Sequence, residues 1–208
     1  ILSGLVGSEM CIRDRATGGS TPTSPPYGAG RFSNGPVFTE RLGFTAANFM
    51  GPVTGNINYA FGGARTDSQA QPLGMRLQLA QYQQRGGTFG ANDLVSVLGG
   101  ANNIFQGLPA AGVSTNPTAS ITPVAQSAAA DINFIVNGIA QAGAGTVLVT
   151  NLPKLSLTPQ FRGTAAAPLA DFAVTTFNGA LLTGLNTTAA ARPGTCLLYT
   201  SPSPRDQR

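Results

Sequence analysis

The alternation of helix-like and strand-like segments is the feature that most restricts the fold of this chain. The longest periodic stretch opens at Thr122 and Pro123 and ends at Gly143. Its apolar positions, spaced by four, four, three and four residues, are Val124, Ala128, Ile132, Ile135 and Ile139. This spacing places them on one face of a helix. The segment Thr146–Thr150 (TVLVT) follows at once and is typical of a buried strand, so the pair indicates an α/β unit.

The other segments continue the same alternation. We expect a helix of two turns after Pro36, a strand at 57–61, a helix over 72–84, a strand at 94–98 and a last helix over about 169–185. Parallel strands need crossover helices to connect them. The order therefore predicts an α/β fold: a parallel central sheet covered by helices on both faces.

Three of the predicted strands end in polar or glycine-rich turns. The sequences are NINYAFGGA, LVSVLGGANN and VLVTNLP. In a parallel sheet, ligands bind at the carboxyl ends of the strands. We therefore expect these three turns to converge on one site.

Composition excludes several classes of protein. The 208 residues are 42% hydrophobic and 10% charged, which favours one globular domain over a disordered segment. The net charge of +4 comes from twelve scattered basic residues, so nucleic acid is not an expected partner. Neither a membrane-spanning run nor a secretion signal is visible, and the sequence indicates no metal and no cofactor.

The two ends of the chain differ in composition from its Gly, Ala, Asn and Thr-rich middle. Met10 to Asp14 can be encoded as ATG TGT ATA AGA GAC, and the reverse complement with flanking bases encodes CLLYTS, the sequence of Cys196 to Ser201. We therefore expect residues 1–15 and 196–208 to be non-native tails translated from a sequencing adapter, and residues 16–195 to be the native part. The alternative is a Cys11–Cys196 disulfide that joins the two ends.

The turn GGANN (99–103) offers neutral hydrogen-bond donors at the end of a strand. Glycines leave backbone N–H groups open, and an asparagine carboxamide adds a donor without a charge; such donors stabilise an oxyanion. Two alternatives stay open at this point. In the first, GGANN is only the entrance of a helix, with Asn102 or Asn103 as its cap. In the second, Gly62 and Gly63 form only a turn between a strand and a helix. A nucleotide site is less favoured, because neither turn has GxGxxG spacing.

Four segments of the middle part, taken in order, resemble the GDSL or SGNH esterases and lipases. GRFSNGPVF (30–38) resembles the family's GRFSNGPVW, and NYAFGGA (58–64) resembles its second block. GGANNIF (99–105) is similar to the third block, usually written GAND, and VLVTNLPKLSLTP (147–159) to VPNLPDLGLTP. Among bacterial members, the autotransporter type is the most similar in style. The resemblance implies a three-layer α/β/α SGNH fold, here truncated at both ends.

The resemblance also implies a serine hydrolase that acts on small-molecule or lipid esters with a Ser-His-Asp triad. It assigns the oxyanion hole to the N–H of Gly63 and the side chain of Asn102. It puts the serine block before Ala16 and the Asp and His block after Thr195, so neither block is expected here, and the chain contains no histidine. Asn103 replaces the aspartate of GAND, which keeps an acceptor but loses the charge that strengthens a hydrogen bond.

The resemblance extends to the cellular location and to an alternative function. Many relatives are secreted or anchored at the outer membrane, so export and an outer-membrane anchoring domain in the full-length protein are expected. The 208 residues alone are expected to be inactive. The alternative is a non-catalytic passenger or adhesion module of a secreted bacterial protein, in which the polar turns serve recognition.

Overall fold

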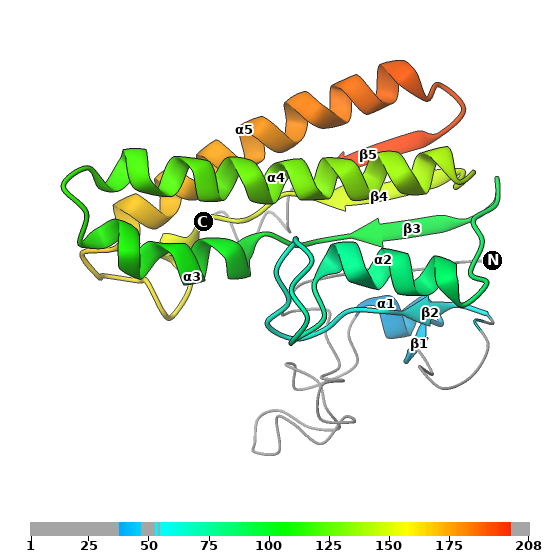
Figure 1. Cartoon of the computed structure of the whole chain (residues 1–208), viewed down its shortest axis with the longest axis horizontal. Helices are drawn as coiled ribbons and strands as arrows, with labels where there is room; N and C mark the ends of the chain where they lie inside the picture. Colours follow the sequence, from blue (N-terminus) through cyan, green and yellow to red (C-terminus); the bar gives the residue numbers. More distant parts are fainter. Residues whose placement is uncertain (1–37, 47–52, 54, 201–208) are drawn as a thin grey trace.

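The computed structural model describes residues 38–46, 53 and 55–200. Its helices are α1 (Phe38–Arg41), α2 (Met75–Gln84), α3 (Ala101–Gly112), α4 (Pro117–Gln141) and α5 (Ala167–Ala191), with a 3₁₀ helix η2 at Leu155–Leu157 (Figure 1). Its strands are β1 (Thr45–Ala46), β2 (Ile57–Asn58), β3 (Leu94–Val97), β4 (Thr146–Thr150) and β5 (Cys196–Thr200). The expected start of the first helix at Pro36, most of the GRFSNGPVF segment and most of the two predicted tails lie outside the described residues.

The central sheet is parallel, as predicted. Its strand order is β3-β4-β5, with Val95 opposite Val147 and Leu148 opposite Leu198. The strand predicted at 57–61 is shorter in the structure, where β2 covers only Ile57 and Asn58. It pairs with β1 in a separate parallel ladder. The α/β class, with a parallel sheet flanked by helices, is thus confirmed.

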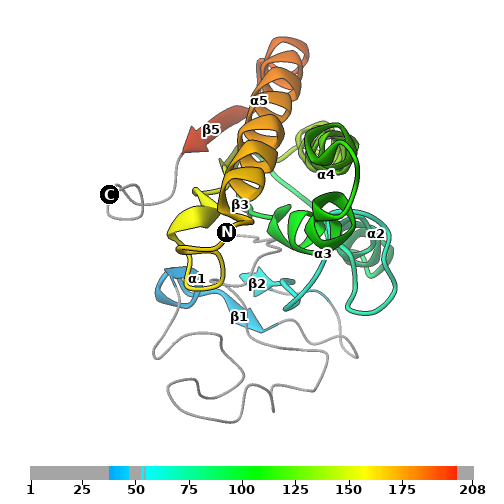
Figure 2. The same ribbon diagram turned by 90° about the vertical axis from the view of Figure 1, so that its left-hand side faces the viewer.

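The two longest helices lie on the same face of this sheet. The chain moves across the sheet in one direction, from β3 to β4 and then to β5. Connections between parallel strands are right-handed, so both crossover helices, α4 and α5, lie on the same side. Figure 2 shows α5 beside α4, and the two helices pack against each other. Under them lie the buried side chains of Val95, Val97, Val147 and Val149. On the opposite face, Leu198 is 47% exposed.

Helix α4 confirms the predicted apolar face but starts earlier than predicted. Ala128, Ile132, Ile135 and Ile139 are all at most 1% exposed. The predicted start at Thr122 and Pro123 is wrong, because the helix begins at Pro117, where the Asn116 side chain accepts a hydrogen bond from the Ala119 N–H at 3.1 Å. Proline suits the first turn of a helix, whose N–H groups have no partner within the helix, and this cap precedes Pro123. Pro123 itself lies inside α4.

Helix α3 is the element that the apolar pattern does not predict as a helix. Its sequence ANNIFQGLPAAG contains Gly107 and Pro109, two residues that disfavour helix interiors. Tertiary packing explains the glycine. A Cβ at Gly107 would lie 3.0 Å from the side chains of both Ile121 and Val124 of α4, so the missing side chain lets the two helices approach closely.

The turn after β4 is fixed by α5. The Asn178 side chain accepts a hydrogen bond from the Leu152 N–H and donates one to the Leu152 carbonyl, each at 2.9 Å. The Tyr199 hydroxyl donates to the Asn178 carbonyl at 3.5 Å. Partial burial raises the pKa of the Tyr199 phenol, and a hydrogen bond with the Asn151 side chain partly offsets this rise.

Candidate functional site

Gly63 lies in the turn that follows β2, at a backbone conformation suited to glycine. Its φ is +74°, and the residue is partly buried beside Pro72, whose Cγ would lie 3.5 Å from an added Cβ. A side chain would be strained at this φ even though there is room for it. Among the described residues, the Gly63 N–H donates no backbone hydrogen bond.

The strand end at β3 leads directly into α3 through Gly100. This residue has a φ of +112°, and a Cβ on it would lie 2.5 Å from the Phe177 ring of α5. Position 100 therefore requires glycine for two reasons: the positive φ of its backbone and the lack of space for a Cβ beside the Phe177 ring. The close approach brings Asn102 and Asn103, both 6% exposed, into the first turn of a helix that is held against α5.

Asn102 and the Gly63 turn, predicted from distant parts of the sequence, meet in the structure. The Asn102 carboxamide N–H donates to the carbonyl of Ala64, the residue after Gly63, at 2.9 Å. A carboxamide nitrogen carries two hydrogens, so this bond fixes the side chain and leaves the second hydrogen for another acceptor. The oxyanion role of the two residues stays a prediction.

The capping alternative for the two asparagines is wrong. Gly100 is the N-cap residue of α3, and no side chain caps the helix. Asn103 instead turns its carbonyl oxygen to the Thr66 N–H, which donates to it at 3.0 Å. Asn103 thus accepts a backbone hydrogen bond with a neutral amide, although it lacks the charge of the aspartate in GAND.

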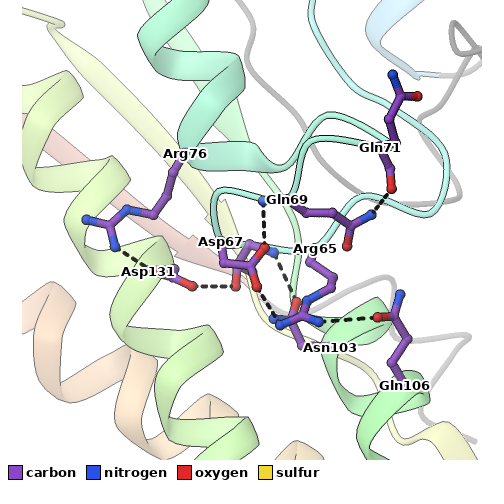
Figure 3. A network of polar contacts seen from close by, with 9 residues as sticks. Arg65, Asp67, Gln69, Gln71, Arg76, Asn103, Gln106 and Asp131 are labelled. Carbon is purple, nitrogen blue, oxygen red and sulfur yellow. Dashed lines mark hydrogen bonds and ion pairs between the residues drawn. The ribbon is translucent and has the colours of Figure 1, made fainter.

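A buried carboxylate, which the sequence analysis did not single out, holds the same turn from the opposite side. Asp131 of α4 accepts hydrogen bonds from the Thr66 hydroxyl and from the Arg76 guanidinium, each at 3.0 Å (Figure 3). Nearby, Arg65 pairs with Asp67 and donates to Gln106 of α3. The turn is therefore bound by side chains of both α3 and α4. An acidic residue next to Ile132 on the apolar face of a predicted helix is the signal that indicates such a contact.

The third predicted turn, NLP, contacts α5 at a position next to Phe177. Asn178 binds Leu152, and the preceding residue, Phe177, lies against Gly100. The ends of β3 and β4 are thus held at neighbouring positions of α5. A cavity of about 340 Å³ opens here, lined by residues 151–154 and by Val174, Thr175 and Asn178.

Within the residues that the structure describes, no group of three or more His, Cys, Asp or Glu side chains is arranged to hold a metal ion. In the same part of the chain, no helix has the length and apolar character needed to cross a membrane.

The sequence that forms this fold and these turns matches a known class of enzymes. The GDSL-like Lipase/Acylhydrolase family matches residues 15–196, and the chain belongs to this family. A phosphatidylcholine-sterol acyltransferase of Aeromonas hydrophila is 34% identical over 152 residues, which cover 69% of this chain and 41% of the relative. The chain thus spans about two fifths of the length of this relative.

Proposed function

We propose that this chain is the middle part of a serine ester hydrolase, in which Gly63 and Asn102 donate to the oxyanion. The observation that carries the proposal is the 2.9 Å contact between the Asn102 carboxamide and Ala64, since it joins two sequence blocks 38 residues apart. Family membership supplies the class of reaction.

In the proposed mechanism, a serine hydroxyl attacks the carbonyl carbon of an ester while a histidine takes its proton. The carbonyl oxygen becomes an oxyanion, and the donors at 63 and 102 stabilise it. The tetrahedral intermediate then expels the alcohol, which receives the proton from histidine, and leaves an acyl-serine. Water cleaves the acyl-serine by the same steps and releases the carboxylic acid.

The serine, histidine and aspartate of this mechanism are proposed to lie outside the native part of this chain. None of the 208 residues is a histidine. We propose that the serine block precedes residue 16, that the Asp and His block follows residue 195, and that residues 1–15 and 196–208 are non-native. Sequencing contiguous genomic DNA on both sides tests these assignments; native codons for CLLYTSPSPRD after residue 195 would contradict them.

Hydrolysis of a chromogenic short-chain ester tests the function. We expect turnover by the complete gene product and none by the 208-residue chain. Robust turnover by the 208-residue chain would contradict the assignment of the missing residues. A complete gene product that has no serine block and no activity would instead favour a passenger or adhesion module.

Acyl transfer is a second candidate, because the Aeromonas hydrophila relative is named as an acyltransferase. Both reactions pass through the same acyl-serine, and they differ only in whether water or an alcohol attacks it. Adding a sterol or a simple alcohol to the assay separates them. Ester products that form faster than free acid indicate transfer, whereas a product mixture that stays almost entirely free acid indicates hydrolysis.

We also propose that the full-length protein is exported, either secreted or held at the outer membrane through an anchoring domain. The support is the resemblance of the four sequence blocks to exported bacterial enzymes. Fractionation of cells that produce the complete gene product tests this location. Recovery of the protein only from the cytoplasm would contradict it.

A further inference from the structure

Asp131 is a carboxylate that α4 holds almost entirely away from solvent. Its side chain is 10% exposed, and both of its oxygens accept hydrogen bonds: Oδ2 from the Thr66 hydroxyl and Oδ1 from Arg76, each at 3.0 Å. A buried carboxylate is costly unless such partners satisfy it, and an apolar residue at the same place often gives equal or greater stability. Stability alone therefore does not explain an aspartate here.

The first partner, Thr66, lies three residues after Gly63 and is 0% exposed. It is held from two directions, because its N–H donates to Asn103 of α3 while its hydroxyl donates to Asp131 of α4. On the α3 side, the Asn102 carboxamide also donates to the nearby carbonyl of Ala64. The hydroxyl bond adds an attachment to α4, so two helices rather than one hold the turn beside Asn102.

The second partner, Arg76, ties the far end of the same segment to α4. Its guanidinium lies 3.9 Å above the centre of the Phe134 ring, one helical turn after Asp131, and its backbone N–H donates to the carbonyls of Thr66 and Asp67 at 3.3 Å. The cation above the ring and the ion pair fix the guanidinium from two sides. Asp131 therefore holds the segment 66–76 at both ends.

We propose that Asp131 is a positioning residue for the oxyanion site, acting through the Thr66 hydroxyl on the turn that carries Gly63. The inference rests on the proposed function. In the structure, Asp131 touches neither Gly63 nor Asn102 through a hydrogen bond, and its effect passes through Thr66 and the backbone between 63 and 66. Misplacing a donor in an oxyanion hole lowers the rate of the chemical step rather than the affinity for substrate.

The first test measures amide hydrogen exchange in the 208-residue chain, which needs no catalytic activity. Thr66→Val and Asp131→Ala remove the hydroxyl bond. We expect the protection factor of the amide at position 66 to fall about tenfold in both, the equilibrium factor of one ordinary hydrogen bond. Thr66→Ser and Asp131→Asn should keep most of the protection, because serine retains the hydroxyl and the Asn carboxamide can donate to it.

A matched control for the threonine is Thr188→Val, a change at a position of α5 that is 6% exposed and far along the chain from the turn. It should leave the protection at position 66 unchanged. Unchanged protection in Thr66→Val and Asp131→Ala overturns the inference, and so does an equal loss in Thr188→Val, since that loss would reflect general destabilisation.

The second test measures kcat and KM of the complete gene product on a short-chain ester. We expect Thr66→Val and Asp131→Ala to lower kcat roughly tenfold to hundredfold, the range for a displaced catalytic group, with KM nearly unchanged. Thr66→Ser and Asp131→Asn should recover most of kcat. A variant kcat equal to that of the active wild type overturns the inference. If the wild type is inactive but protection at position 66 falls, the proposed function fails while the attachment of the turn by Asp131 stands.

Discussion

Two regions of this molecule are held in place in different ways. The turn after β2 is bound by side chains of α3 and α4. Asn102 binds the carbonyl of residue 64, Asn103 binds the N–H of residue 66, and Asp131 binds the hydroxyl of residue 66. Strand β5 is bound mainly by its backbone, which pairs with β4 along its whole length. None of its five side chains is buried.

The comparison shows how strongly each region depends on its sequence. Backbone pairing requires only an extended segment with free N–H and C=O groups, so many sequences can occupy the edge position next to β4. The turn requires a carboxamide, a hydroxyl and a carboxylate at particular positions. Its arrangement therefore depends on particular residues of this chain, whereas the pairing of β5 does not. The non-native status of residues 196–208 stays a prediction.

The largest expected effect tests whether the side-chain contacts of the turn serve catalysis. Asn102→Ala should lower kcat of the complete gene product about 10²- to 10³-fold, as expected for the loss of one oxyanion donor. Ester hydrolysis measures it. Asn116→Ala is the matched control, because the Asn116 side chain also hydrogen bonds to the backbone, where it accepts from the Ala119 N–H at the start of α4. It should cost about 1 kcal/mol of stability and leave kcat unchanged. Equal kcat losses in both variants would remove the distinction.

The next test compares a glycine at the start of α3, the helix that binds the turn, with a glycine just before β5. Gly100→Ala places a methyl group 2.5 Å from the Phe177 ring at a φ of +112°, and should lower the free energy of unfolding by about 2–4 kcal/mol. Gly194→Ala, just before β5, meets no atom within 4 Å and should change it by less than about 0.5 kcal/mol. Urea denaturation measures both. Similar costs at the two positions would contradict the comparison.

A third test places the same new residue in neighbouring strands. Val149→Thr brings a hydroxyl into the core, where Val149 is 1% exposed, and should cost about 1–3 kcal/mol. Leu198→Thr in β5 changes a side chain that is 47% exposed, and should stay within about 0.5 kcal/mol of the wild type. Thermal unfolding of both variants checks this. A large loss from Leu198→Thr would show that β5 depends on its own side chains.

The smallest expected effect concerns the one side chain of β5 with a raised pKa. Partial burial raises the pKa of Tyr199 above the value of about 10 that the phenol has in the unfolded chain. Near that pH the unfolded chain begins to lose the phenol proton while the folded state keeps it. The stability that Tyr199 contributes is present below that pH and is lost as pH rises through the folded-state pKa. Tyr199→Phe should therefore show a smaller fall in its urea midpoint between pH 9 and 11 than the wild type. Identical falls would contradict the assignment.

Much of the fold is predictable because its pattern is local. The apolar spacing over Ala128–Ile139 and the run TVLVT predict α4 and β4, and the boundaries of β4 agree with the structure. Helix α3 is not predictable in this way, since Gly107 and Pro109 oppose helix formation and only contact with α4 and α5 explains it. The 72–84 helix begins three residues late, at Met75, because Gly74 precedes it in extended conformation.

In the candidate site, too, some residues are predictable from local sequence and others are not. Gly63 and Asn102 are identifiable from their motifs, and the structure brings Asn102 to the turn that contains Gly63. Asp131 is not identifiable in this way, because its partners Arg76 and Thr66 lie 55 and 65 residues away along the chain. No local period or motif links residues at such separations. Only the packing of α2 and α4 brings them together.

The two hydrogen bonds between Asn178 and Leu152 have a consequence for which sequences can share this fold. The Asn178 carboxamide, one methylene from the backbone, both accepts from and donates to the peptide groups of Leu152, as a neighbouring backbone would. Aspartate lacks the donor, and glutamine extends one carbon too far. Homologues that keep the NLP turn should therefore retain asparagine at this helix position, or change the turn and the helix residue together.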